Sequence, residues 1–163
     1  MTMENIIENL KAMQHYSGKV VIENDIIYWE GEHKKTVQIL LNEIAIIGEY
    51  TTFNTVNSDD WFMVFLNKKA ECQKVSMYAE GINILRKELA TKFQTSIHGK
   101  LYASTTWDSN IVYPKYLKNE KLFDFSAEST GLISDKLRRI LGLERKTKIT
   151  LNATIKNYCL ERM

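Results

Sequence analysis

The sequence predicts an α+β fold, in which a twisted and mainly antiparallel sheet has about three helices packed on it. Two observations lead to this class. β-rich runs separated by short polar turns return at about ten-residue intervals between residues 19 and 78, which is typical of an antiparallel meander. The predicted strands and helices do not alternate regularly along the chain, and this argues against a doubly wound parallel sheet.

The first predicted element is a helix that ends before the strands begin. Ile6, Leu10 and Met13 recur at helical spacing. Thr2 is placed to cap the first turn, and Gly18 is placed to end the last one.

Strands are predicted next, each bounded by residues that favour turns. Turns at Glu23–Asp25 and Glu30–His33 separate three runs within residues 19–40. Further strands are expected at 44–50, 61–66 and 72–78, separated by turns at 42–43, 57–60 and 67–71.

A second helix is predicted from residue 82 to residue 93. Its apolar stripe consists of Ile82, Leu85, Leu89 and Phe93. Two strands are then expected at 96–104 and 110–117, around a turn at 108–110. Pro114 should place the second of them at a sheet edge or end its ladder, because proline has no N–H to donate. The run 122–125 predicts a further short strand.

The last part of the chain predicts a helix followed by a strand. The third helix is expected over about 129–141, ending at Gly142. Its apolar face consists of Leu137, Ile140 and Leu141. Apolar and polar residues then alternate from 148 to 156, which predicts a half-buried strand with Ile149 and Ile155 on its core face. Cys159 would follow this strand as a small packing residue.

The bulk composition, 44% hydrophobic and 26% charged, is that of an ordinary globular protein. We expect one α+β domain over residues 1–163, because the chain has no obvious linker; a division into 1–95 and 96–163 is the alternative. A net charge of +2 provides no strong field for nucleic acid or an anionic membrane. The N-terminus has early acids and no long apolar run, which predicts a cytoplasmic protein without a signal peptide or transmembrane segment.

Motifs of the common catalytic sites are missing from the sequence. Neither the glycine-rich phosphate loops nor the GxSxG nucleophile elbow occurs. The histidines have no metal-spaced neighbours; they are His15, His33 and His98. Cys72 and Cys159 are expected to be reduced, and Cys72 would need a base such as His98 to become a nucleophile. We therefore predict no catalytic residue, no metal site and no cofactor.

Two alternatives concern the last third of the chain. A metal-dependent nuclease could use Asp124 with Glu144 and Lys146, because carboxylates and an acid-x-lysine before a strand can hold a divalent ion. A lipid or nucleic-acid binding module could use the basic residues there. These are Arg138, Arg139, Arg145 and Lys146. Acidic residues are interspersed among them, so a solvated mixed-charge face is the simpler interpretation.

Aromatic residues gather in one stretch of the chain. Tyr102, Trp107, Tyr113 and Tyr116 lie within fifteen residues, among Ser, Thr, Asn and Asp. Tyr and Trp combine a large contact area with a polar tip and are enriched at interfaces. These four residues are therefore candidate partner-binding residues, although they could also cover the core. The predicted function is a small non-catalytic binding protein that acts on another protein, as an adaptor, inhibitor or immunity-type neutraliser.

Residues 19–93 resemble a bacterial pleckstrin-homology-like domain. The resembling pieces are "IENDIIYWEG", "KTVQILLNEIAIIG", "DWFMVFL" and "GINILRKELATKF". The resemblance implies a hairpin, further strands and a closing helix, in a module that binds lipid head groups or peptides and is rarely an enzyme. The first hairpin turn, Glu23–Asp25, is acidic, whereas a phosphoinositide site requires lysines and arginines. No binding residue is carried over.

Asp59 and Asp60 form an adjacent acid pair directly before an apolar run. Neighbouring residues at the start of a strand point to opposite faces, so the two carboxylates are not expected to converge in one cleft. We interpret them as the polar end of a turn. The strand that follows should bury one of two sets, either Phe62, Val64 and Leu66 or Trp61, Met63 and Phe65.

Overall fold

The computed structural model describes residues 17–31, 36–52, 59–102, 104, 106–127 and 147–161. Several predicted features lie outside these ranges: residues 1–16 of the first helix, the helix over about 129–141, and His15, His33, Arg138, Arg139, Glu144, Arg145 and Lys146.

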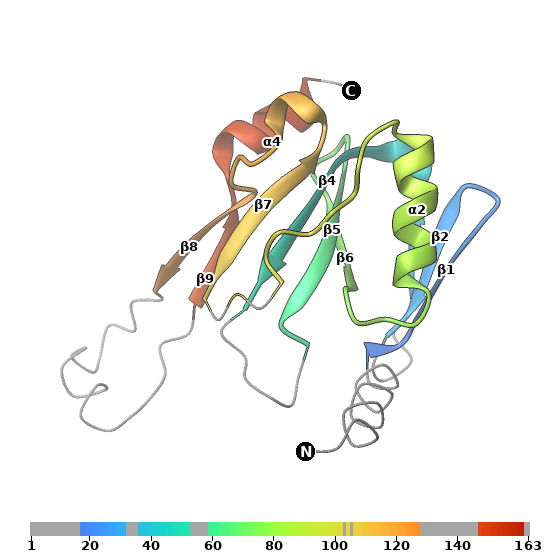
Figure 1. Cartoon of the computed structure of the whole chain (residues 1–163). Helices are drawn as coiled ribbons and strands as arrows, with labels where there is room; N and C mark the ends of the chain where they lie inside the picture. Colours follow the sequence, from blue (N-terminus) through green and yellow to red (C-terminus); the bar gives the residue numbers. More distant parts are fainter. Residues whose placement is uncertain are drawn as a thin grey trace, which may run out of the picture.

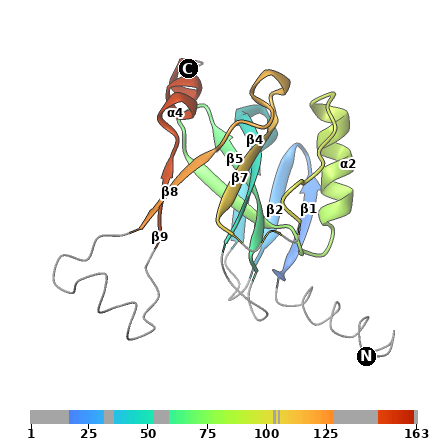
Figure 2. The ribbon, with the colours of Figure 1, turned by 60° about the vertical axis from the view of Figure 1, so that its left-hand side comes forward.

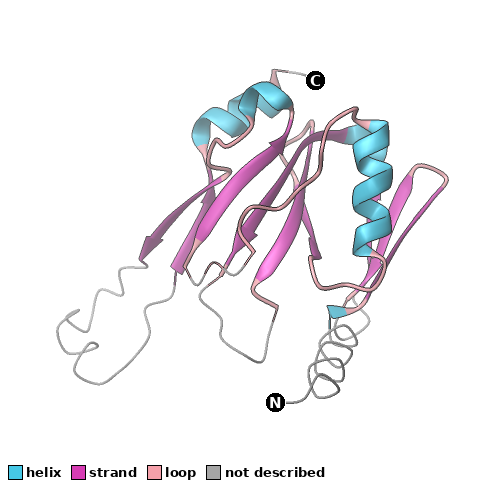
Figure 3. Cartoon of the chain, viewed as in Figure 1, coloured by secondary structure: helices cyan, strands magenta, loops and turns pink. Residues whose placement is uncertain are grey.

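The described residues form an α+β structure with two α-helices rather than about three (Figures 1 and 3). The strands are β1 (Lys19–Glu23), β2 (Ile26–Glu30), β3 (Thr36–Leu40), β4 (Ile44–Thr51), β5 (Trp61–Asn67), β6 (Cys72–Ser76), β7 (Asp108–Tyr113), β8 (Phe123–Ala127) and β9 (Thr147–Leu151). The α-helices are α2 (Ile82–Lys92) and α4 (Ala153–Leu160), and the 3₁₀ helices are η2 (Leu41–Glu43) and η3 (Lys115–Leu117).

The strands are antiparallel, as predicted, but they form three sheets instead of one. The strand orders are β1-β2-β3, β6-β5-β4-β7 and β8-β9. The 3₁₀ turn η2 redirects the chain after β3, so β4 pairs with β5 and β7 and does not continue the first sheet. The view in Figure 2 shows β1 and β2 on one side of the four-stranded sheet and the β8-β9 ribbon on the other.

The turn between β1 and β2 lies at the predicted place. Asn24 and Asp25 both have positive φ, at 50° and 62°. Positive φ at both central positions matches the type I′ turn that two-residue hairpins favour, and Asn and Asp tolerate this conformation.

Both faces of β5 are buried, so neither predicted set of residues faces solvent. Trp61, Met63 and Phe65 belong to a core shared with α2 and the inner face of the β1-β2-β3 sheet. The alternate side chains belong to a second core, where they meet Leu122 from the start of the β8 region and Ile155 of α4. They are Phe62, Val64 and Leu66. The four-stranded sheet is therefore the middle layer of the molecule.

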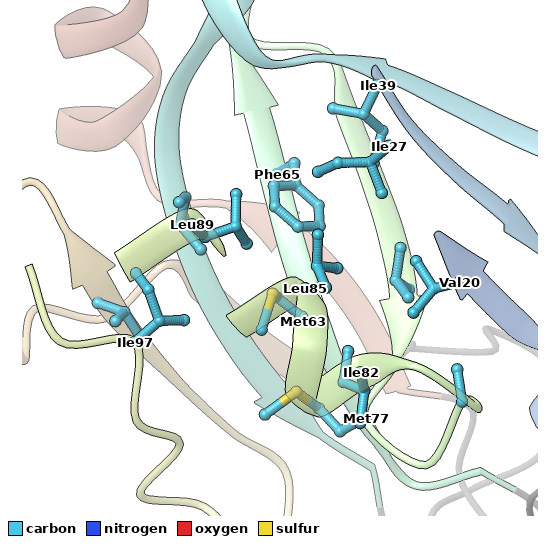
Figure 4. Packing of buried hydrophobic residues seen from close by; sticks show 14 of the residues in the cluster. Val20, Ile27, Ile39, Met63, Phe65, Met77, Ile82, Leu85, Leu89 and Ile97 are labelled. Atoms are coloured by element: carbon cyan, nitrogen blue, oxygen red, sulfur yellow. The ribbon is translucent and has the colours of Figure 1, made fainter. Parts of the chain in front are cut away.

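Helix α2 confirms the helix predicted from its apolar stripe. Ile82, Leu85 and Leu89 are buried in the first core. Figure 4 shows Leu85 and Leu89 beside Phe65 of β5, with Val20 of β1 nearby. Burying one such leucine contributes about 1.5–3 kcal/mol, so this stripe fixes the helix on the sheet.

The region after α2 corrects two predictions. The described residues 96–102 and 104 do not form the predicted strand, and 108–110 are not a turn but the first half of β7. Ser109 and Asn110 look like turn residues, yet both are buried because β4 supplies partners for them in the sheet. β7 is the edge strand of its sheet and ends directly before Pro114, as the lack of a proline N–H predicts.

The final predicted strand is shorter than expected. β9 ends at Leu151, and α4 begins at Ala153 because the Asn152 side chain caps it, accepting a hydrogen bond from the Thr154 N–H at 3.0 Å. Ile155 and Cys159, one helical turn apart, are buried. Ile149 keeps 39% of its surface exposed, so the alternating pattern does not create the predicted buried face. The predicted short strand at 122–125 is confirmed as β8.

Candidate functional site

Glu49 is a charged residue inside the fully buried strand β4, with 1% of its surface exposed. Its Oε1 accepts hydrogen bonds from the Lys100 N–H at 2.7 Å and the Asn110 side-chain amide at 2.8 Å. Its Oε2 accepts from the Trp61 indole N–H at 2.8 Å and the Leu101 N–H at 3.4 Å. Four donors from three separate parts of the chain thus satisfy the carboxylate that folding removes from water.

The bonds from Lys100 and Leu101 hold the loop of residues 97–102 against the four-stranded sheet. Ile97 at its start is buried in the first core. Gly99 passes so close to the sheet that a Cβ there would lie 2.2 Å from Trp61 and 2.8 Å from Glu49 Oε2. The loop therefore needs glycine at this position, and the carboxylate and the core fix its path.

Three aromatic rings lie where this loop crosses the beginning of β5; we call Trp61, Tyr78 and Tyr102 the Tyr102 platform. The Tyr102 ring centroid is 5.5 Å from that of Trp61, and Tyr102 keeps 70% of its surface exposed. Tyr78 contacts the same indole edge-on at 6.2 Å. Trp61 itself is 8% exposed, so a buried indole supports an exposed tyrosine.

The two adjacent aspartates border this platform but bind different elements. Asp60 accepts a hydrogen bond from the Tyr78 hydroxyl at 2.7 Å, and Asp59 accepts one from the Ser17 hydroxyl at 2.6 Å. Burial, and then the bond to Asp60, raise the pKa of Tyr78 well above its ordinary value, so its hydroxyl remains a donor. The bonding pattern is that of two structural acceptors, not of a pair sharing a proton.

The four predicted partner-binding residues do not gather on one surface. Tyr102 packs on Trp61, whereas Trp107 packs on Phe125 of β8. The half-buried Tyr113 contacts Phe93 with a ring-centroid distance of 4.7 Å, and Tyr116 contacts Tyr158 of α4. These last two contacts lie toward the end of the sheet opposite the platform, because Thr51 pairs with both Trp61 and Asp108 while Ile47 pairs with Tyr113.

Cys72 does not have the environment of a nucleophile. Desolvation raises its pKa to about 11, and the attraction of Lys74 only partly offsets this effect. The thiol therefore stays protonated at neutral pH. Cys159 is fully buried in α4, which agrees with its predicted packing role but not with its predicted place after a strand.

A cavity of about 140 Å³ lies where the edge strands β3 and β6 approach each other. Its lining includes Glu43 and Glu71, the latter held by the Asn67 side chain at 2.6 Å. Elsewhere, the Asp124 carboxylate lies 3.4 Å from the Asn152 amide beside α4. Across the described ranges, no three His, Cys, Asp or Glu side chains gather in a way that could hold a metal ion.

Comparison with protein-family models, with curated proteins and with solved structures finds no match. None of the helices within the described residues has the length and apolar composition to cross a bilayer.

Sequence reasoning missed Glu49, Trp61 and Tyr78 as parts of the site. Glu49 carried one usable signal, because it is the charged residue in the otherwise uncharged run 44–51. A charge inside a buried strand must find partners, which marks it as the centre of a network. Nothing local identifies those partners, since Asn110 is 61 positions away along the chain.

Proposed function

We propose that this protein is a small non-catalytic binding protein, and that it contacts another protein through the Tyr102 platform. The observation that carries the proposal is the position of Tyr102, which is 70% exposed although the loop beneath it is tied to a buried carboxylate. An adaptor, an inhibitor and an immunity-type neutraliser would all use such a surface.

The physical reason is preorganisation. An exposed tyrosine on a mobile loop would lose conformational freedom on binding, at a cost of about 0.5–1.5 kcal/mol for each immobilised side chain. Here, the Glu49 bonds and the Trp61 contact have already restricted the loop. Tyrosine and tryptophan are also enriched among the residues that dominate binding energy at protein interfaces.

The order of elements supports a binding role in a second way. Strands β1 to β6 followed by α2 match the order of a hairpin, further strands and a closing helix that the pleckstrin-homology-like resemblance implies. We carry over only the general expectation of a cytoplasmic binding module. The acidic turn at Glu23–Asp25 favours a protein partner over a phosphoinositide.

Site-specific photocrosslinking tests this proposal. A photoreactive phenylalanine analogue replaces Tyr102 in one variant and Tyr116 in another, and both are expressed in the native cell. Tyr116 is the matched control, because it is 62% exposed but lies toward the opposite end of the sheet. We expect a discrete crosslinked protein from position 102 and not from position 116. Equal crosslinking at both positions, or none at position 102, would contradict the proposal.

A further inference from the structure

We infer that the Tyr102 platform binds a basic segment of the partner protein, with a lysine or arginine side chain against the exposed tyrosine and beside Asp59 and Asp60. This inference rests on the proposed function and names the chemistry of the partner. Two independent features support it: the charge around the platform, and the nature of its aromatic surface.

Among the described residues, no lysine or arginine forms an ion pair with Glu49, Asp59 or Asp60. Glu49, Asp59 and Asp60 accept hydrogen bonds from neutral donors only: N–H groups, an amide and hydroxyls. The ion pairs within the described ranges involve other carboxylates: Lys19 pairs with Glu80, Lys92 with Asp25, and Lys121 with Asp108, the last at the same end of the sheet as Trp61.

The ammonium groups of the nearby lysines are directed to other partners. The Lys100 ammonium, on the loop itself, donates to the Asn119 side chain. The stretch 53–58, which leads from β4 toward Asp59, contains no charged residue. Asp59 and Asp60 are therefore two carboxylates beside the Tyr102 platform that have no ion-pair partner among the described residues, on a protein with a net charge of +2. Such a surface favours a basic partner and slows the approach of an acidic one.

The aromatic rings are suited to the same ligand. Lysine and arginine cations are attracted to the faces of aromatic rings, most strongly to tryptophan and tyrosine. The Tyr102 ring is inclined to the buried Trp61 indole by 58° and is the exposed ring of the platform, with 70% of its surface accessible. The fold already contains contacts of this kind, since the Lys74 ammonium lies 4.0 Å from the centre of the Phe62 ring and 5.7 Å from that of the Tyr50 ring.

The test is an NMR titration of the full chain with tetra-arginine and, separately, with tetra-glutamate. The reporters are the Trp61 indole N–H and the backbone N–H groups of Lys100 and Leu101, all of which bond to Glu49. We expect tetra-arginine to shift these signals, with an affinity that falls as salt is raised. Tetra-glutamate should not shift them.

The variants test whether the aspartates contribute directly. Asp59→Asn with Asp60→Asn keeps an acceptor for Ser17 and Tyr78 but removes two charges, and it should weaken tetra-arginine binding roughly 2- to 25-fold, the effect of two exposed ion pairs. The matched control is Glu43→Gln with Glu71→Gln, which removes two charges beside the cavity between β3 and β6. The control should leave the affinity nearly unchanged.

Three results would overturn the inference: no shift with tetra-arginine, an equal shift with tetra-glutamate, or equal weakening by both double variants. Tyr102→Phe should retain binding and Tyr102→Ala should weaken it, because the ring face and not the hydroxyl is the proposed contact. If photocrosslinking at position 102 persists in the Asp59→Asn/Asp60→Asn variant without loss, the basic partner is refuted while the binding surface stands.

Discussion

The substitution Glu49→Gln tests the role of the buried carboxylate with the smallest possible change of shape. Each carboxylate oxygen accepts two hydrogen bonds, so a glutamine amide must place its NH₂ group against two N–H donors in either orientation. A buried donor left without an acceptor costs about 1–3 kcal/mol.

The surroundings of Glu49 determine how many of these donors would lose their acceptor. Asn110 can rotate its own amide and accept from the new NH₂ group, but the Lys100 N–H that shares Oε1 cannot adapt in this way. One donor then remains unpaired, and the other hydrogen bonds lose a charged acceptor. We expect a total loss of about 2–4 kcal/mol, a large part of the 5–15 kcal/mol typical of a domain.

Urea unfolding followed by tryptophan fluorescence measures this loss in the free energy of unfolding directly. On heating, the melting temperature should fall by roughly 4–16 °C, since 1 kcal/mol corresponds to about 2–4 °C for a chain of this size. The control is Glu88→Gln on the exposed surface of α2, which should stay within about 0.5 kcal/mol of the wild type. A loss below 1 kcal/mol for Glu49→Gln would refute the assignment of Glu49 as the anchor of the loop.

Three further changes test other parts of the structure. Ser109→Ala removes the buried hydroxyl that accepts from the Leu122 and Phe123 N–H groups, and should cost about 2–4 kcal/mol in urea unfolding; a loss as small as that of Ser126→Ala would contradict this. Gly81→Ala should lower the melting temperature by several degrees, because φ is +89° and a Cβ would meet the Val20 carbonyl oxygen at 2.3 Å; an unchanged melting temperature would disprove this strain. Cys72, with its pKa raised to about 11, should react slowly with iodoacetamide at pH 8 and faster toward pH 11. The folded state holds the Cys72 proton more tightly than the unfolded chain does, so the contribution of Cys72 to the free energy of unfolding is present below about pH 9 and is lost toward pH 11. If a Cys72→Ser variant loses as much stability over this pH range, Cys72 is not the cause of the loss.

The features that sequence reasoning predicted correctly depend on neighbouring residues. The apolar stripe of α2 repeats within one helix, and the β1-β2 turn depends on Asn24 and Asp25 alone. The spacing of the apolar residues alone predicts the buried face of a helix, because side chains three or four positions apart share a helix face.

The errors arose where partners distant in the chain decided the structure. Asp108–Asn110 have the composition of a turn, and only pairing with β4 and the bond from Asn110 to Glu49 make them a strand. The contact of Tyr102 with Trp61 is equally nonlocal. The error at Asn152 was different, because the information there was local. Asn152 is a helix-capping residue, but the strand predicted from the alternating pattern was continued past it to residue 156.

The burial of β5 on both faces has a consequence for synthesis on the ribosome. The face formed by Phe62, Val64 and Leu66 is covered partly by Ile155, about ninety residues later in the chain. At a synthesis rate of about 5–20 residues per second, roughly 4–18 s pass between the synthesis of this apolar face and the synthesis of Ile155, which covers part of it. A nascent chain that carries β5 therefore offers a chaperone an uncharged apolar strand until α4 emerges. A chain truncated before β7 would keep that face exposed permanently and is expected to aggregate.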